Sequence, residues 1–255
     1  MGFLEKINKR VSSRISCSRF LAARACLPRL NGLDEAMLSL ISPDTIYTSA
    51  NNDISNDLVA VALEAAGRAV RMDMVSVSDR IKSGPRWPDI WPGEHYRFLA
   101  GLIDYLQPST VVEIGTFLGL SALAIKKYLP AHGKLLTFDI IPWHSLPETC
   151  LMESDFMDGR LKQELGDLAD AAVFDSHRSL FSRADIIFLD GPKDRIFERT
   201  FLERLGTVKF EVPSLLVIDD IRLWSMLDIW KEIKLPKLDV TSLGHFSGTG
   251  LVRLK

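Results

Sequence analysis

The stretch that decides the fold reads Val111-Val112-Glu113-Ile114-Gly115-Thr116-Phe117-Leu118-Gly119-Leu120-Ser121. A β-branched apolar run ends at the acid Glu113, crosses Gly115 and Gly119, and continues into apolar residues at helical spacing. This order predicts a strand, a tight turn and the start of a helix. Because glycines allow close approach to the backbone and a helix N-terminus offers free N–H groups, we expect a nucleotide-like ligand at this turn.

Short apolar segments alternate with helical segments after this stretch. We predict strands over 111–114, 135–138, 161–165, 186–189 and 215–218. We predict helices over 121–129, 168–180, 195–205 and 223–233, with a further helical segment around 146–157. Two last strands, near 238–243 and 250–254, would finish the sheet in antiparallel fashion. The alternation predicts an α/β fold with a doubly wound, mostly parallel, Rossmann-like sheet that binds ligands at the carboxyl ends of its strands.

The chain before this sheet reads as a separate region. A helix is expected from Asp57 onward and another over 94–106, while 31–56 reads as loop. The stretch 83–93 is dense in proline and tryptophan, and we interpret it either as a rigid linker or as a lid over a substrate pocket. We therefore divide the chain into an N-terminal helical extension, 1–92, and a ligand-binding domain, 93–255.

Composition excludes several classes of function. The net charge of −2 gives no basic face for nucleic acid, and no apolar run is long enough to span a membrane. Cys17, Cys26 and Cys150 are too few and too irregular for a disulfide framework or a zinc site. These features predict a cytoplasmic protein in a reducing setting.

Residues 1–30 differ from the rest in charge. They contain seven basic residues against Glu5 alone, with Phe3, Ile7 and Val11 at helical spacing. The pattern fits a basic amphipathic helix packed on the acidic body or on a partner subunit of a homodimer. It also fits a helix in weak contact with a membrane surface, or a leader segment.

Acids occupy the expected carboxyl ends of four strands. They are Glu113, Asp139, Asp190 and the pair Asp219-Asp220. Because the ends of parallel strands meet at one edge of a sheet, we expect these carboxylates to converge there.

The glycine spacing discriminates among nucleotide-like ligands. A dinucleotide fingerprint needs a third glycine, and a P-loop needs Gly-Lys-Ser/Thr; neither is present. The pattern Glu113-x-Gly115-x-x-x-Gly119 instead resembles motif I of class I S-adenosylmethionine (SAM) methyltransferases. By this resemblance, Glu113 organises the amino end of SAM and Asp139 accepts both ribose hydroxyls.

Further motifs resemble the catechol O-methyltransferase-like, divalent-metal-dependent O-methyltransferases over roughly 93–255. They are Glu113 to Ala122, Asp139 to Pro142, Ile187 to Arg195 and Val217 to Asp220. The resemblance implies a seven-stranded sheet with an antiparallel last strand. For SAM binding it implies Glu113, Gly115, Thr116, Phe117, Gly119, Ser121, Asp139, Ile140, Gly166, Asp167 and Asp190. In particular, Ser121 would contact the methionyl carboxylate, Ile140 would pack on the adenine, and Gly166-Asp167 would lie beside the adenine edge.

The same resemblance implies the reaction chemistry. Asp190, Asp219 and Asp220 fall where the family holds Mg²⁺, and Lys193 falls where it has a catalytic lysine. Hard carboxylate oxygens suit Mg²⁺, which can lower the pKa of a bound hydroxyl, and Lys193 could take the proton if a nearby cation lowers its own pKa. Gly191-Pro192 replaces the His-Trp of the catechol enzymes. We therefore expect a small hydroxylated acceptor, phenolic or sugar-like, rather than catechol itself.

Several alternatives stay open on the sequence. A metal-independent N- or O-methyltransferase, a nicotinamide oxidoreductase and a non-catalytic SAM-fold scaffold share this sheet. Asp220 could instead cap the helix expected from Leu223. His95, His144 and His245 are isolated in sequence, and His245 lies nearest the expected pocket.

Overall fold

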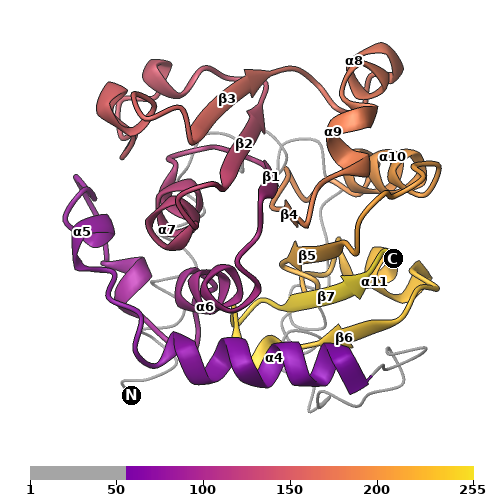
Figure 1. Cartoon of the computed structure of the whole chain (residues 1–255), viewed down its shortest axis with the longest axis horizontal. Helices are drawn as coiled ribbons and strands as arrows, with labels where there is room; N and C mark the ends of the chain where they lie inside the picture. The colour runs from indigo at the N-terminus through magenta and orange to yellow at the C-terminus, as the bar shows by residue number, and fades with distance from the viewer. Residues whose placement is uncertain (1–55) are drawn as a thin grey trace, which may run out of the picture. The chain divides into compact units, whose positions relative to one another are not determined.

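The structure, a computed structural model, describes residues 56–255. Within this range it contains a seven-stranded sheet in the order β3-β2-β1-β4-β5-β7-β6 (Figure 1). The strands are β1 (Thr110–Ile114), β2 (Lys134–Asp139), β3 (Leu161–Leu165), β4 (Ile186–Leu189), β5 (Leu215–Asp219), β6 (Lys237–Asp239) and β7 (Thr249–Arg253). The first five run parallel, and β7 pairs antiparallel with both β5 and β6. The predicted Rossmann-like sheet with an antiparallel last strand is confirmed.

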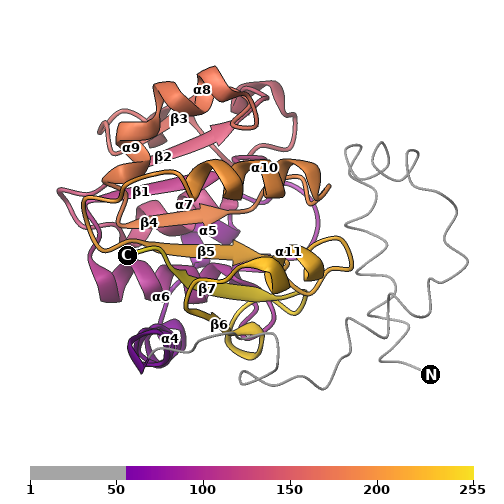
Figure 2. The same ribbon diagram turned by 90° about the vertical axis from the view of Figure 1, so that its right-hand side faces the viewer.

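Helices cover both faces of the sheet (Figures 1 and 2). The helices before β4 are α4 (Asn56–Ala69), α5 (Val75–Ser78), α6 (Tyr96–Leu106), α7 (Leu120–Tyr128), α8 (Ala171–Ser176) and α9 (Arg178–Ser182). Those after it are α10 (Ile196–Leu205) and α11 (Leu227–Glu232). Short 3-10 turns are η1 (Trp87–Asp89), η2 (Trp143–Ser145), η3 (Glu153–Asp155) and η4 (Thr241–Leu243).

Neighbouring residues of β1 point to opposite layers of the core. Val111 packs with Phe98 of α6 and other residues of α4 and α7, whereas Val112 packs with Phe174 and Phe201 of α8 and α10. This alternation is the period of two that a strand buried on both faces requires. β1 lies between β2 and β4, so the acid at its end is surrounded by sheet.

The helix pair α4 and α6 packs closely because Gly101 has no side chain. A Cβ at Gly101 would lie 2.3 Å from the carbonyl oxygen of Ala65. In the stretch 83–93, Trp87 and Trp91 pack against the core, and Trp91 Nε1 donates to the carbonyl of Leu243 at 2.9 Å. The loop 83–93 is therefore attached to the connection between β6 and β7.

Four predicted elements differ from the structure. The helix over 168–180 is two helices that meet at His177, whose Nδ1 lies 2.9 Å from the carbonyl oxygen of Val173. The strand near 238–243 ends at Asp239, because Thr241 N donates back to its carboxylate at 3.0 Å and the chain turns into η4.

The other two differences are shorter helices. Only η3 is helical within 146–157, where Asp155 accepts bonds from Arg80 at 2.6 and 3.0 Å. The helix expected from Leu223 begins at Leu227 with Met226 as its N-cap, so Asp220 does not cap it.

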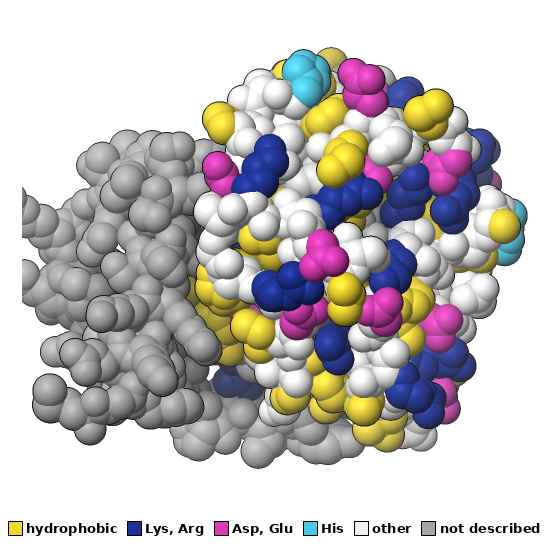
Figure 3. Space-filling model, turned by 90° about the vertical axis from the view of Figure 1, so that its left-hand side faces the viewer, with side chains coloured by type: hydrophobic (Ala, Val, Ile, Leu, Met, Phe, Trp, Pro, Cys, Tyr) yellow, Lys and Arg dark blue, Asp and Glu magenta, His cyan; other side chains and the backbone are white. Residues whose placement is uncertain are grey.

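Charged side chains of both signs are intermixed on the face shown in Figure 3. Ion pairs of the described residues include Lys127–Asp73 at 3.1 Å and Arg160–Asp158 at 3.2 Å. Among residues 56–255, no helix has the length and apolar character needed to cross a bilayer. The predictions for the basic segment 1–30 and the loop 31–56 fall on residues outside, or at the first residue of, the described range.

Candidate functional site

The turn between β1 and α7 has the conformation that its glycines allow. Gly115 has φ +105° and Gly119, the N-cap of α7, has φ +81°, both in the left-handed region that disfavours side chains. A Cβ at Gly115 would lie 2.1 Å from the carbonyl oxygen of Asp190. Between the glycines, Phe117 also has positive φ and its ring is partly exposed.

Asp139 lies at the end of β2 and faces this turn. Its two carboxylate oxygens accept the backbone N–H groups of Phe117 and Ile141, each at 3.0 Å. Beneath it, the hydroxyls of Thr116 and Thr137 are 2.8 Å apart. The carboxylate is thus fixed in position beside the turn.

Glu113 is fully buried at the end of β1, and its carboxylate oxygens have no hydrogen-bond partner among the described residues. Burial raises the pKa of Glu113 to about 8, and the charges of Asp190 and Asp139 add to the shift. An unpartnered buried carboxyl is costly, so this position suits a ligand that brings hydrogen-bond donors or positive charge.

The remaining residues expected at the methyl donor lie around the same edge. Gly166 N donates to the carbonyl of Asp139 at 3.0 Å, and Asp167 is exposed and accepts the N–H of Ala169 at 2.8 Å. Ile140 is 64% exposed. Ser121 has its Oγ 3.1 Å from Nε2 of His95.

Three aspartates gather at the ends of β4 and β5. Oxygens of Asp190, Asp219 and Asp220 lie within 4.8 Å of one another, close enough to hold one metal ion. Asp220 has φ +62° at the end of β5, and the hydroxyl of Ser247 donates to its carboxylate. The acids predicted at the ends of β4 and β5 therefore lie together at this edge of the sheet.

Lys193 points into this acidic group from the loop after β4. Its Nζ lies 2.5 Å from Asp190 Oδ1 and 3.4 Å from Asp220 Oδ2. Burial lowers the pKa of Lys193, but the negative charges of Asp190, Asp220 and Asp219 outweigh it and raise the pKa above its usual value. Without a further cation, Lys193 is therefore an ammonium group that cannot accept a proton.

Glu198 holds the loop that carries Lys193, a role that the sequence analysis did not identify. Its buried carboxylate accepts the backbone N–H groups of Lys193 at 2.7 Å and Arg195 at 3.0 Å, both residues of positive φ. Glu198 is the third residue of α10. An acid at the third position of a predicted helix often bonds backbone N–H groups before the helix, and this pattern could have identified Glu198 from the sequence.

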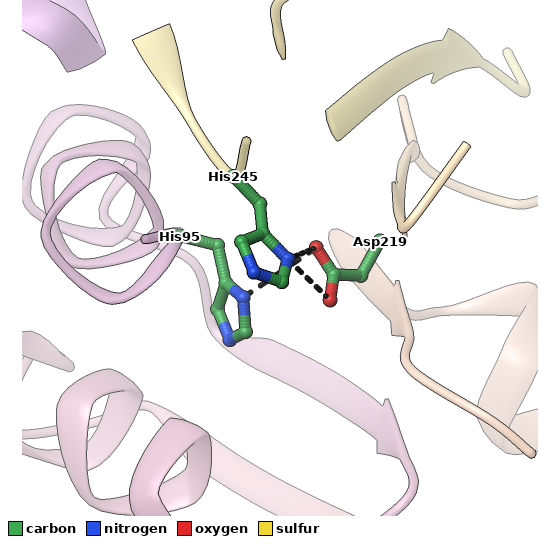
Figure 4. Close-up of side chains that lie close together, drawn as sticks. All are labelled: His95, Asp219 and His245. Atoms are coloured by element: carbon green, nitrogen blue, oxygen red, sulfur yellow. Dashed lines mark hydrogen bonds and ion pairs between the residues drawn. The ribbon is translucent and has the colours of Figure 1, made fainter. Parts of the chain in front are cut away.

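Two buried histidines approach Asp219 (Figure 4). His245 Nδ1 lies 3.1 and 3.2 Å from the two oxygens of Asp219, and His95 Nδ1 lies 3.4 Å from Oδ1. The carboxylates of Asp219 and Asp220 raise the pKa of His245 to about 10 despite its burial, which acts in the opposite direction. The third candidate histidine, His144, is exposed in η2.

The sequence from 88 to 231 matches the family described as O-methyltransferase. This chain belongs to the O-methyltransferase family. It is a SAM-dependent methyltransferase, as motif I and the seven-stranded sheet predict. The nicotinamide and non-catalytic alternatives, and N-methylation, have no support from this membership.

Several solved structures are similar to this family member. A methyltransferase from Geobacter sulfurreducens is 16% identical, over 89% of this chain and 98% of its own, with a TM-score of 0.46. The methyltransferase PaMTH1 of Podospora anserina, bound to S-adenosylhomocysteine (SAH), is 16% identical over 90% and 98%, with a TM-score of 0.48. MycE of the mycinamycin biosynthetic pathway, in complex with Mg, SAH and mycinamycin VI, is 24% identical over 44% and 28%, with a TM-score of 0.35. No curated protein sequence matches the chain.

Proposed function

We propose that this O-methyltransferase transfers the methyl group of SAM to a hydroxyl of a small molecule with the help of Mg²⁺. The observation that carries the proposal is the meeting of Lys193, Asp190 and Asp220 beside the turn that contains Gly115. A cation-binding group and a proton-accepting side chain thus lie next to the turn at which the methyl donor is expected.

The residues at the donor side fit SAM. The unpartnered carboxyl of Glu113 can receive donors from the amino end of the ligand, and Asp139 is fixed for bonds to ribose hydroxyls. We assign SAM binding to Glu113, Gly115, Thr116, Phe117, Gly119, Ser121, Asp139, Ile140, Gly166, Asp167 and Asp190. When bound there, SAM supplies an electrophilic sulfonium methyl group.

The donor set at the metal side fits Mg²⁺. Asp190, Asp219 and Asp220 offer only carboxylate oxygens, which are the ligands that this hard cation prefers. The cation would supply positive charge, which lowers the pKa of an acceptor hydroxyl and weakens the hold of the carboxylates on the Lys193 proton.

The chain's own residues would then perform the reaction. Lys193 takes the proton of the acceptor hydroxyl at Nζ, while Asp190 holds Nζ toward the acceptor side through its hydrogen bond. The carbonyl of Asp190 touches Gly115, so the loop that orients the acceptor is held against the turn that orients the donor. Fixing both reactants in this way accounts for much of the expected acceleration.

Exposed apolar side chains indicate the kind of acceptor. Ile196, Trp224 and Phe246 are 75%, 36% and 49% exposed, and each lies within a few residues of a member of the acidic group or its histidines. Exposed apolar side chains beside a polar site can contact the apolar part of a ligand. Of the two expected acceptor classes, this favours a phenolic molecule over a sugar.

A metal-independent O-methyltransferase is the second candidate. Lys193 already places a positive charge between Asp190 and Asp220, and in this reading the ammonium itself neutralises the pocket. A lysine that stays charged would position the acceptor rather than accept its proton.

Calorimetry and turnover distinguish the two candidates. SAH should bind the protein with and without Mg²⁺, and turnover of a panel of phenols should require Mg²⁺ and stop on addition of EDTA. Asp190→Asn should lose activity and metal stimulation together, whereas Asp228→Asn, on an exposed acid, should change neither. Full turnover in EDTA would leave the metal-independent candidate.

The N-terminal residues and the cellular compartment concern where and with what the enzyme works. We propose that residues 1–92 form an extension that contributes a homodimer contact or a weak membrane-surface contact, and that the enzyme works in the cytoplasm. Deleting 1–30 and measuring the oligomeric state and vesicle binding tests both contacts.

A further inference from the structure

The buried histidines meet Asp219 with the same ring nitrogen. His95 comes from the residue before α6, His245 from the connection between β6 and β7, and Asp219 from the end of β5. Both Nδ1 atoms face the Asp219 carboxylate (Figure 4). All three residues are at most 4% exposed.

We propose that His95, Asp219 and His245 form a second metal site, for a borderline divalent ion of the Zn²⁺ class. This goes beyond the Mg²⁺ proposed above, because the donor set is different: two imidazoles are added, and of the all-carboxylate group Asp219 takes part, with Asp220 in reach. Two imidazoles with one carboxylate are ligands typical of Zn²⁺ and related transition metals and not of Mg²⁺.

The distances between the donor atoms have the size that a bound ion requires. Zn–N and Zn–O bonds are about 2.0–2.2 Å long, so the ligand atoms around a four- or six-coordinate ion lie about 2.9–3.5 Å apart. The Nδ1-to-oxygen distances are 3.1 and 3.2 Å for His245 and 3.4 Å for His95. Asp220 Oδ1, 3.3 Å from His245 Nδ1, is in reach as a fourth donor.

The far nitrogen of the His95 ring has a hydrogen-bond partner of the kind that metal-binding histidines normally have, and that of His245 faces a carboxylate at longer range. His95 Nε2 lies 3.1 Å from the hydroxyl of Ser121, and His245 Nε2 lies 3.6 Å from the carboxylate of Glu94. The contact with Ser121 fixes the orientation of the His95 ring and leaves its Nδ1 available to the ion, whereas His245 Nδ1 would give up its hydrogen bond with the hydroxyl of Ser247, 2.9 Å away, to bind the ion.

One buried donor atom has no other use among the described residues. His95 Nδ1 is buried without a hydrogen-bond partner, although a carboxylate oxygen stands 3.4 Å away. When Nε2 carries the ring proton and donates to Ser121, two lone pairs face each other at that distance, which a cation would resolve. The neighbouring carboxylates of Asp219, Asp220 and Asp190, facing Lys193, also favour additional positive charge.

An ion at this place would connect three separated parts of the chain. It would hold the start of α6, the end of β5 and the connection before β7 around a carboxylate that also belongs to the acidic group. Because the three residues are buried, we expect a slowly exchanging ion that stabilises the fold rather than one that meets the acceptor.

Metal uptake by the full chain tests the proposal. Protein stripped with EDTA and dialysed into excess Mg²⁺ should bind one Zn²⁺ per chain by elemental analysis, and its Tm should rise. Co²⁺ used in place of Zn²⁺ should give the intense visible absorption of low-coordinate nitrogen and oxygen ligation, rather than the weak bands of a six-oxygen site. Absence of tight Zn²⁺ uptake, or only the weak Co²⁺ bands, would overturn the proposal.

Variants locate the ion. His95→Gln and His245→Gln should each lose the Zn²⁺ that survives dialysis against Mg²⁺, while His144→Gln, on the exposed histidine, should keep it. Asp190→Asn should also keep it, because Asp190 belongs only to the proposed Mg²⁺ group. Retention of Zn²⁺ by both folded histidine variants would contradict the assignment; if neither variant folds, the wild-type Co²⁺ spectrum and Tm shift decide.

Discussion

The carbonyl oxygen of Asp190 lies against the α-carbon of Gly115, so close that a Cβ there would be 2.1 Å from it. The two residues belong to different motifs, one at the end of β1 and one at the end of β4, which pair in parallel. The turn expected to hold the methyl donor and the loop that carries Lys193 are therefore joined backbone to backbone.

Gly115→Ala should disrupt both motifs at once. The positive φ alone costs a side chain about 1–2 kcal/mol, and displacement of the Asp190 backbone should add about 1–3 kcal/mol. Gly84→Ala is the matched control, since Gly84 has φ +96° with nothing within 4 Å of a Cβ. Urea unfolding should show a clearly larger loss for Gly115→Ala, together with weaker SAH binding. Equal losses would mean that the contact with Asp190 is unimportant.

Asp139→Ala should weaken SAH binding in addition to lowering the free energy of unfolding, since its carboxylate accepts two backbone N–H groups. Loss of charge-assisted hydrogen bonds to the ligand is worth about 1.5–3 kcal/mol, or roughly a ten- to hundredfold change in Kd by calorimetry. Asp185→Ala removes a carboxylate that likewise accepts two backbone N–H groups, those of Ser109 and Thr110 at 2.8 Å. It should lower the free energy of unfolding and leave Kd for SAH unchanged. Similar effects of both variants on Kd would contradict the ribose assignment.

The acids at the strand ends could be predicted because their positions follow from topology alone. Once the strands are known to be parallel, Glu113, Asp139, Asp190 and Asp219 must end at one edge. The glycine spacing predicted which kind of ligand binds at this edge. It could do so because Gly115 and Gly119 meet conformational requirements that are local to the turn.

The residues that the sequence did not assign depend on long-range packing. His95 and His245 are far apart in sequence, and no periodicity indicates that both meet Asp219. The end of β6 at Asp239 also involves a distant residue, because the carboxylate that accepts the N–H of Thr241 is held by the guanidinium of Arg222, which donates to it at 2.6 Å. A strand pattern in Leu238 to Leu243 cannot reveal this competing contact.

Glu113→Gln should remove a pH dependence of stability. The pKa of Glu113 is raised from 4.5 to about 8 in the folded protein, so the native state holds a proton that the unfolded state releases. Stability from this group is therefore fully present below pH 4.5 and is lost as the pH rises to about 8, with an effect on the order of a few kcal/mol. The amide cannot titrate, so the variant should lack this slope.

Urea unfolding of wild type and variant across pH 4.5–8, without SAM, measures the difference between the two slopes. The exposed acid Glu203 supplies the control, because Glu203→Gln should keep the wild-type slope. SAH binding should weaken in Glu113→Gln and stay unchanged in Glu203→Gln. A parallel pH dependence for wild type and Glu113→Gln would mean that the buried carboxyl is not protonated.

Lys193→Ala should separate catalysis from donor binding. If Nζ takes the acceptor proton, kcat should fall by about 10²–10⁴-fold. Calorimetry with SAH should give an unchanged Kd, because Lys193 touches Asp190 and Asp220 rather than the donor turn.

The pH dependence of kcat gives a second test of Lys193. The aspartates raise the pKa of Lys193 above its usual value. The neutral amine therefore becomes available only as the pH rises, and kcat measured with Mg²⁺ should rise with the pH. Lys193→Ala should lack the rise, and Lys209→Ala, on an exposed lysine, should retain it. Lys193→Arg keeps the positive charge but has no usable base, so it should restore stability and not turnover. If Lys193→Arg restores turnover, Lys193 positions the acceptor as a permanent cation and the base lies elsewhere.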